Sequence, residues 1–412
     1  MCDTLCAPGS GGMIFAKNSD RPAGEVQLVV PFGRRPTAGC TLRTQYLSIG
    51  DTGAHAALLS CPTWLWGAEH GVNEFGVAIG NERVSTVHDI ERARPGLIGM
   101  DLVRLGLERA RSAPQAVEVL IELLTTHGQG GVADAAHGEA YDSSFLIADA
   151  KDAFVLDTSG TSYAAAPFFS GTAISNRLTV GTRWTKASPE LDPGDDFDRF
   201  RNQDAPTDSA DVRRAAGLAF LDAQRAEASG LSPAATAAHL RDHGHGPWGA
   251  PGAPAGRSAP PPPPPNGILD GAEGAPSVSV CMHVPQRSVT AASLIAVLPA
   301  DLAEGAPLRA YVALGSPCVS IYVPAFLRTV AGAPPFVPFE LSSEAMWRAA
   351  DALRQQLARD PLAIGSIREV LDPIEDELWQ EADDVVERPD LWTDVGSSWG
   401  ARALGALQAC DI

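Results

Sequence analysis

The chain has 412 residues, 45% of them hydrophobic, and its fifty acidic and thirty-one basic residues give a formal net charge of -19. This length and apolar content are sufficient for a large globular core. The negative charge repels phosphate backbones and anionic lipids, so we expect neither nucleic acid nor a membrane as a partner.

The chain also lacks the segments that direct proteins into membranes or out of the cell. It contains no run of about 18 apolar residues, and no basic region followed by an apolar stretch at the N-terminus. We therefore expect a cytoplasmic protein without cofactors. Scattered cysteines with no C-x-x-C pair predict free thiols and no structural zinc site. The cysteines are Cys2, Cys6, Cys40, Cys61, Cys281, Cys318 and Cys410.

Short strands and amphipathic helices alternate along the first 330 residues. Apolar positions that recur every three or four residues predict helices, and short apolar runs between Gly, Pro and Asp-rich turns predict strands. We expect helices at 99–111, 114–127, 211–225 and 233–241, and strands at 4–7, 13–17, 25–30, 54–60, 144–148, 153–157, 172–175, 277–282, 292–297 and 309–314.

A Pro-rich segment interrupts this pattern at about 249–276 and includes six consecutive prolines. Such a composition favours an extended surface loop. Because strand patterns resume after it, we interpret it as an insertion within one domain of residues 2–330. The tail, residues 331–412, predicts a helical extension packed on that domain, and the acidic helix near 374–387 predicts a solvated face.

Cys2 directly follows Met1, and a small second residue favours removal of the initiator. Removal would expose an α-amine with a pKa of about 7.7–8.0, which can accept a proton from the neighbouring thiol. Nucleophile and base would then belong to one residue. The alternative is an incidental cysteine at a frayed terminus, but a strand pattern and a Gly-rich hairpin follow immediately.

The polar sequence KNSDRP, residues 17–22, lies where that hairpin would return the chain to Cys2. A cation such as Lys17 would favour the thiolate, and Asp20 would hold the α-ammonium group. Arg21 is a candidate for substrate binding. The alternative is an ordinary solvated turn, because Asn, Ser and Asp are common turn residues.

Residues 64–82 form the most informative stretch of the chain. Asn-Glu-Phe-Gly at 73–76 predicts a tight turn into a buried strand, with Asn81 at its far end and Gly80 leaving no room for a long side chain. The Asn81 amide is a candidate donor to an oxyanion. Trp64 and Trp66 are either walls of a substrate pocket or core aromatics.

Together, nine ordered motifs resemble the secernin and bacterial cysteine dipeptidase family of N-terminal nucleophile hydrolases. They are CDT, KNSDRP, WLWGAEHGVNEFGVAIGNE, GMDLVRLGLERA, HGQGG, SFLIAD, ISNRL, SVCMH and GSPC. The resemblance covers about residues 2–326 apart from the Pro-rich insertion. It implies an α+β fold, a four-layer αββα sandwich with the nucleophile at the start of a central strand.

The resemblance also implies roles for single residues. The nucleophile falls on Cys2, the aspartate that binds the amine on Asp20, and the oxyanion-hole asparagine on Asn81. A second asparagine, which positions the amine and the substrate, falls on Asn176. Related bile-salt and penicillin acylases carry an arginine where this chain has Lys17, which keeps the charge but not the planar fork.

Three further sites in the sequence are candidates for substrate or metal binding. Arg287 is our candidate for the distal active-site arginine of those acylases. His283 either faces the substrate or is a satisfied core histidine. His243-Gly244-His245 resembles a metal-binding fragment but lacks a third and fourth ligand, so we predict no metal there.

These features predict a cysteine hydrolase of small amide or peptide bonds, with a dipeptidase favoured, that acts through a thioester on Cys2. An amidase or acyltransferase acting on N-acyl compounds would use the same site. A non-catalytic regulatory protein is the alternative from another class, since the secernin family is associated with secretion as well as hydrolysis. The expected partner is a small peptide or N-acyl substrate, and a homo-oligomer is left open.

Overall fold

The computed structural model describes residues 1–9, 11–37, 39–88, 94–227, 230–243, 279–284, 288–300, 302, 307–328 and 335–410. Arg287, His245 and the Pro-rich segment 249–276 therefore lie outside the described residues, as does the predicted domain boundary at 330. Among the described helices, none is both long and apolar enough to cross a bilayer.

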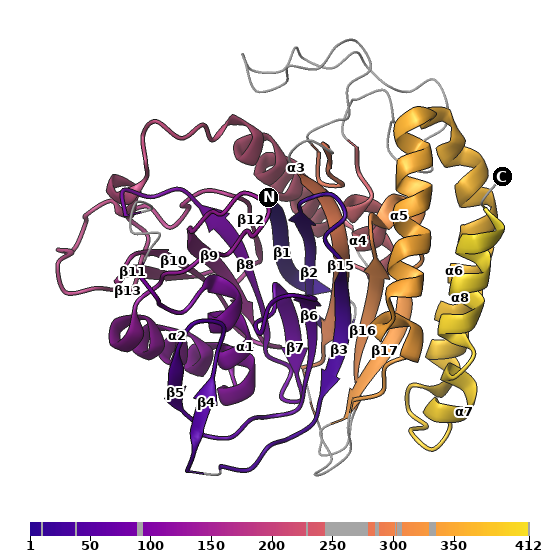
Figure 1. Ribbon diagram of the computed structural model, residues 1–412, viewed down its shortest axis with the longest axis horizontal. Coiled ribbons are helices and arrows are strands. Elements are labelled where there is room, and N and C mark those ends of the chain that lie inside the picture. The colour runs from indigo at the N-terminus through magenta and orange to yellow at the C-terminus, as the bar shows by residue number, and fades with distance from the viewer. Residues whose placement is uncertain are drawn as a thin grey trace.

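Two antiparallel sheets form the centre of the molecule (Figure 1). The first has the strand order β12-β1-β2-β15-β16-β17, with β14 also paired to β15, and the second has the order β13-β11-β10-β9-β8-β7-β6-β3. A separate pair joins β4 (Thr41–Arg43) to β5 (Ser48–Gly50). The first sheet comprises β1 (Cys2–Gly9), β2 (Gly12–Arg21), β12 (Thr172–Ile174), β14 (His283–Val284), β15 (Ser288–Leu298), β16 (Pro307–Leu314) and β17 (Val323–Arg328); the second comprises β3 (Gln27–Phe32), β6 (Ala57–Pro62), β7 (His70–Asn73), β8 (Ala78–Val84), β9 (Asp142–Ala148), β10 (Ala153–Ser159), β11 (Ser162–Pro167) and β13 (Lys186–Ala187).

Strand β2 shows how the layers are built from the sequence. Met13 and Phe15 belong to the apolar core between the sheets, whereas Ile14 and Ala16 belong to a second core on the opposite face of the first sheet. Side chains alternate along a strand, so a continuous apolar run serves two layers. This explains why residues 13–16 of the strand are hydrophobic at every position.

Helices cover both outer faces of the sheets. Helices α1 (Gly99–Arg109) and α2 (Ala113–His127) pack on the second sheet, and α3 (Asp208–Ala226) and α4 (Pro233–Leu240) pack on the first. The result is the αββα sandwich that the family resemblance implies, and the fold prediction is confirmed. Its four layers leave the strand ends at one edge of the sheets open for a site.

The C-terminal helices stand beside this sandwich, next to β17 (Figure 1). They are α5 (Glu344–Arg359), α6 (Ile364–Val385), α7 (Trp392–Gly396) and α8 (Trp399–Ala409). Their apolar stripe joins the core between the sheets. The acidic helix is not wholly solvated, because Glu375 is buried and its Oε2 lies 2.5 Å from Arg241 Nη2.

The described part of the chain corrects two local predictions and excludes one alternative. Residues 279–281 are bends and residue 282 has no regular structure, so this part of the predicted strand 277–282 is wrong. Residues 17–21 are buried within β2 and do not form a solvated turn, because β1 and β15 pair with β2 on either side. Asn81 lies in the middle of β8, which continues to Val84 by pairing with β9.

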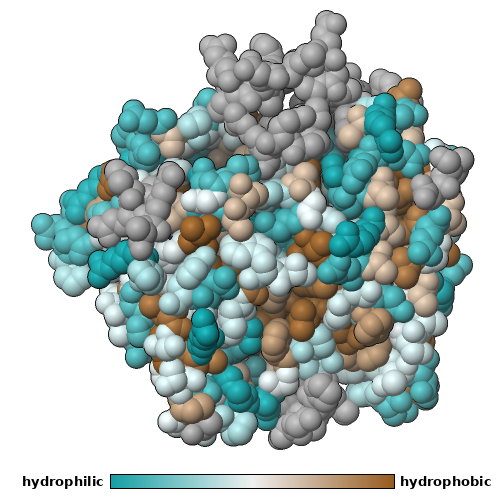
Figure 2. All heavy atoms as spheres, viewed as in Figure 1, coloured by the Kyte–Doolittle hydropathy of each residue, from teal (hydrophilic) through white to brown (hydrophobic). Residues whose placement is uncertain are grey.

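The molecular surface mixes polar and apolar side chains on the face shown in Figure 2. The large apolar side chains that are exposed among the described residues come from separate elements, and include Val87, Phe169, Val212, Phe339 and Leu362. Scattered single residues of this kind are usual on folded proteins and do not define a docking patch.

Gly80 offers a test of the packing between the sheets. A Cβ at this position would lie 2.6 Å from Lys17 Cδ and 3.2 Å from Thr4 Oγ1, and Lys17 is held by its own hydrogen bonds. We expect Gly80→Ala to destabilise the fold by roughly 1–3 kcal/mol in urea denaturation. Gly50→Ala, which meets nothing within 4 Å, is the control and should be near neutral. Equal stability of the two variants would contradict this account of the packing.

Candidate active site

Cys2 is the first residue of β1 and lies at the edge of a cavity of about 360 Å³. The cavity is also lined by Asp20, Arg21 and Asn176. The structure therefore brings together four of the residues expected from the sequence, although they come from three different strands or loops. The Cys2 side chain is only 5% exposed.

Hydrogen bonds define the surroundings of the Cys2 backbone nitrogen. It donates to Asn176 Oδ1 at 2.8 Å. The Met1 α-ammonium group donates to the Asp20 carbonyl at 3.1 Å and to Ser288 Oγ at 3.4 Å. The end of the chain is thus held by β2 and β15 and is not frayed.

The Asp20 carboxylate is close enough to interact electrostatically with the terminal ammonium group and with the Cys2 thiol. Thr290 Oγ1 donates to Asp20 Oδ1 at 2.7 Å, while Asp20 Oδ2 has no hydrogen-bond partner among the described residues. Burial raises the pKa of Asp20 to about 7, although the terminal ammonium group and Arg213 favour its ionised form. An acceptor oxygen is therefore available beside the amine.

The Cys2 thiol must lose its proton before its sulfur can act as a nucleophile, so it needs a nearby base. Burial raises the pKa of the Cys2 thiol, the Lys17 ammonium group opposes this rise, and the Glu69 carboxylate adds to it. A thiol of raised pKa is neutral near pH 7, and only the thiolate is a strong nucleophile. Cys6 is a buried residue whose pKa is raised to about 12 by desolvation, so it suits a packing role and not that of a second nucleophile.

Lys17 lies behind the sulfur and is fully buried. Its ammonium group donates to the Asn81 carbonyl at 2.5 Å and pairs with Glu82 Oε1 at 3.3 Å. Burial acts to lower the pKa of Lys17, but Cys2 and Glu82 raise it above its ordinary value. Lys17 is therefore a fixed cation next to Cys2 and does not belong to the wall of the cavity.

Glu69 is a neighbour of the nucleophile that the sequence did not reveal. Its Oε2 lies 4.0 Å from Cys2 Sγ, and its Oε1 accepts from Arg21 Nη1 at 2.8 Å. The Asn81 amide lies against the same carboxylate. With its nitrogen on that side, it donates to Glu69 Oε2 at 3.2 Å and to the Glu69 carbonyl at 2.9 Å.

Arg213 of α3 is the second residue missed from the sequence. Its guanidinium group donates to the Cys2 carbonyl at 3.1 Å, to Asp3 Oδ2 at 2.6 Å and to Asn176 Oδ1 at 2.7 Å. Arg213 is thus a buried cation beside Cys2, while Arg287 lies outside the described residues and stays a prediction. One signal was present: Arg213 shares the buried stripe of α3 with Gly217 and Leu221, each four residues apart.

Other predicted substrate-binding residues lie elsewhere. Trp66 stacks on Arg104, with 4.1 Å from the guanidinium carbon to the ring centre, and Trp64 packs on a small buried cluster around Met100. His283 is buried next to Cys281 and Cys318. None of the three is among the described residues that line the cavity, so both tryptophans pack as core aromatics.

The remaining walls of the cavity carry charges of both signs. Arg83 pairs with Glu139 and lies over the Tyr141 ring at 5.3 Å from its centre. His137 Nδ1 lies 2.9 Å from Asp134 Oδ2. These five residues face the same space as Cys2, so the cavity suits a small ligand with both positive and negative groups.

No known protein-family profile matches this chain. Its structure is similar to that of penicillin V acylase from Agrobacterium tumefaciens, with 12% sequence identity over 81% of this chain and 89% of that chain and a TM-score of 0.45. It is also similar to the C2A mutant of conjugated bile acid hydrolase from Clostridium perfringens, with 10% identity over 82% and 96% of the two chains and a TM-score of 0.44. A third similarity is to an N-acylethanolamine-hydrolyzing acid amidase orthologue from Caenorhabditis elegans, with 13% identity over 43% and 71% and a TM-score of 0.29.

Replacement of Arg213 by methionine tests its role. The change leaves the buried Asp3 and Asp20 carboxylates without their cation, which costs about 3–5 kcal/mol in comparable cases. We expect this loss in denaturant titrations. Without the cation the pKa of Asp20 rises further above its value of about 7, so the deficit should grow as pH rises through about 7 and shrink in acid.

The neighbouring Arg214 is the matched control, because it is half-buried and donates to the Ala173 carbonyl without contacting the site. Arg214→Met should cost less than about 1 kcal/mol. A similar loss in both variants, or a loss independent of pH, would contradict the assignment.

Proposed function

We propose that this chain is a cysteine hydrolase of small amide or peptide bonds, related to the secernins and bacterial cysteine dipeptidases. The observation that carries the proposal is the position of Cys2. Cys2 lines the cavity together with Asp20, and its backbone nitrogen donates to Asn176 Oδ1 at 2.8 Å. A residue so placed has a nucleophile and, once Met1 is removed, a base.

The reaction would begin with a proton transfer from the Cys2 thiol to the free α-amine. The sulfur then attacks the substrate carbonyl carbon and forms a tetrahedral oxyanion. The resulting α-ammonium gives its proton to the leaving nitrogen as the C–N bond breaks, which leaves a thioester. Water then attacks the thioester, releases the acid and restores the thiol.

Fixed charges around Cys2 would assist each step without rearrangement. Lys17 stabilises the thiolate, and Asp20 with Asn176 holds the ammonium form of the amine. The Asn81 amide is the candidate donor to the oxyanion, as expected from the sequence. That amide is engaged with Glu69, so donation to the oxyanion requires exchange of this hydrogen bond when substrate binds.

The charged walls favour a dipeptide over a compound with a long acyl chain. The cavity volume of about 360 Å³ lies near the lower end of the usual range for small-molecule sites, about 300–1,000 Å³. Arg83 suits the carboxylate of a dipeptide, and Asp134 suits its ammonium group. An acyl chain would instead need apolar walls.

The competing activities use the same site and differ in substrate. A panel of dipeptides assayed against N-acyl amino acids, with hydroxylamine to trap an acyl-enzyme, separates a dipeptidase from an amidase or acyltransferase. If the protein cleaves none of the dipeptides in the panel, the favoured substrate class is ruled out. The proposed setting is the cytoplasm, where a free cysteine thiol stays reduced.

Substitution of Cys2 provides the principal test. Cys2→Ala should reduce kcat by several orders of magnitude, on the order of 10⁴ to 10⁶, since it removes the nucleophile. Activity of the natural chain should rise with pH as the α-amine loses its proton. The control is Cys6→Ala, whose side chain is buried on the same strand and should leave turnover nearly unchanged.

Intact mass measured on the same preparations shows whether Met1 is present. An active protein that retains Met1 would be incompatible with the mechanism, because the Cys2 nitrogen would then be an amide. So would a Cys2→Ala variant with full activity.

A second test concerns recognition of the substrate carboxylate by Arg83. Arg83→Gln removes a charge-assisted hydrogen bond worth about 1.5–3 kcal/mol, so KM for dipeptides should rise by about tenfold to a hundredfold. KM for the corresponding dipeptide amides should change little. Arg199→Gln is the control, because Arg199 is exposed and pairs with Asp195 away from the cavity. An equal effect of Arg83→Gln on dipeptides and their amides would contradict this role.

A further inference from the structure

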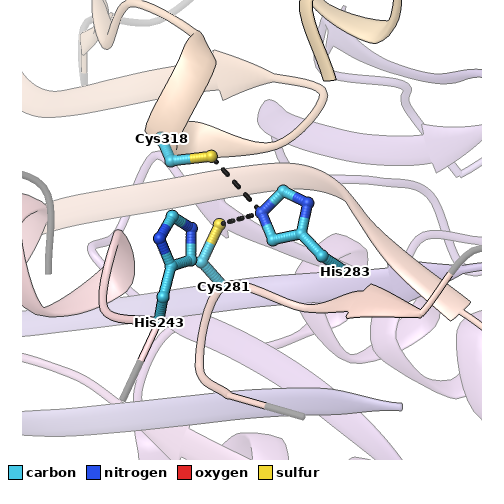
Figure 3. Close-up of side chains that lie close together, drawn as sticks. All are labelled: His243, Cys281, His283 and Cys318. Atoms are coloured by element: carbon cyan, nitrogen blue, oxygen red, sulfur yellow. Dashed lines mark hydrogen bonds between the residues drawn. The ribbon is translucent and has the colours of Figure 1, made fainter. Parts of the chain in front are cut away.

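Two histidines and two cysteines converge beside the first sheet, outside the cavity of Cys2 (Figure 3). They are His243, Cys281, His283 and Cys318, and none is more than 1% exposed. One donor atom from each lies within 4.8 Å of the donor atoms of all the others. Four such side chains facing one point form a complete set of metal ligands.

The distances fit a tetrahedral ion. Zinc–sulfur bonds of about 2.3 Å and zinc–nitrogen bonds of about 2.0–2.1 Å separate tetrahedral donor atoms by about 3.3–3.8 Å. His283 Nε2 lies 3.3 Å from Cys281 Sγ and 3.3 Å from Cys318 Sγ. The rings of His243 and His283 are 4.9 Å apart and nearly perpendicular, so both can direct a nitrogen at one ion.

Hydrogen bonds hold the three ligand-bearing segments together. The Cys281 amide donates to the Asp242 carbonyl at 2.9 Å, which joins the segments of His243 and His283. Arg241 Nε donates to the Pro317 carbonyl at 2.9 Å, which ties the first segment to that of Cys318. The ligands are therefore positioned by the fold itself, as a preformed site requires.

We propose that His243, Cys281, His283 and Cys318 bind one structural Zn²⁺ ion. Two thiolates and two imidazoles in tetrahedral arrangement are the ligand set that favours zinc. Four protein ligands and complete burial leave no position for a substrate, so the ion cross-links the fold. This inference is independent of the proposed hydrolysis, and it revises our expectation that the chain binds no metal.

The site is also connected to the catalytic cavity through the hydroxyl group of Thr290. Met282, between two of the ligands, donates its amide hydrogen to Thr290 Oγ1 at 2.8 Å, and the same hydroxyl donates to Asp20 Oδ1 at 2.7 Å. A shift of the 281–283 segment would therefore move Thr290 and alter the position of the Asp20 carboxylate in the cavity wall. Zinc would act as a positioning element for Asp20.

The first experiment measures metal in the full chain, purified without chelators from cells supplied with zinc. Elemental analysis should find about one zinc per chain. Cobalt exchanged into the protein should give thiolate-to-cobalt charge-transfer absorption, which tests the ligands without mutation. Three outcomes would each overturn the proposal. The first is a metal-free protein that does not take up added zinc, and the second is copper or iron bound in place of zinc. The third is a Cys281–Cys318 disulfide found by non-reducing peptide mapping.

The second experiment uses variants. Cys318→Ser and His283→Ala should each lower zinc content at least about tenfold, since each removes one of four ligands. The control is Cys61→Ser, a buried cysteine of β6 outside the cluster, which should keep its zinc. Cys2→Ala should also keep its zinc while losing activity, which separates this site from the proposed active site. Full zinc content in Cys318→Ser would refute the assignment, and if that variant does not fold, the cobalt spectrum decides.

Discussion

The pairing of β1 with β2 is the constraint on which the rest of the site depends. Its register sets Cys2 opposite Ser19. Since side chains alternate along strands, Lys17 shares the face of the Cys2 sulfur, and Asp20 projects from the other face. A slip of one residue would exchange these faces and separate both charges from their targets. The apolar core on either side of β2 resists such a slip, so the burial that stabilises the sandwich also aligns its chemistry.

Several buried charges near Cys2 form ion pairs. Arg213 pairs with Asp3, Arg21 with Glu69, and Lys17 with Glu82. Buried pairs contribute little net stability, because desolvation costs several kcal/mol per ion and offsets their attraction. Their value lies in orientation: charges already fixed in a low-dielectric site need no reorganisation during a reaction. This accounts for a concentration of ion pairs around Cys2.

Strand β15 links the site to the rest of the molecule. Thr290 lies opposite Asp20, and a bulge follows between Thr290 and Ala292. At this bulge the Ala291 carbonyl accepts from Trp347 Nε1 of the C-terminal helices at 3.0 Å. The His and Cys cluster contacts the same strand through Met282. These contacts connect the Asp20 carboxylate, through β15, to the C-terminal helices and to the His and Cys cluster. The packing of the C-terminal helices therefore influences the geometry of the cavity.

The sequence alone determined what depends on neighbours along the chain. Periodicity predicted α1 to α4 and most central strands, and the N-terminal hairpin placed Lys17 and Asp20 near Cys2, because local pairing follows from a tight turn. Only tertiary structure brought in Glu69, Arg213 and the His and Cys cluster. These residues reach their partners from separate elements, and the burial that fixes their charges arises only when the layers pack. Spacing along a chain carries no information about such contacts, and for that reason the proposed zinc site was not predicted.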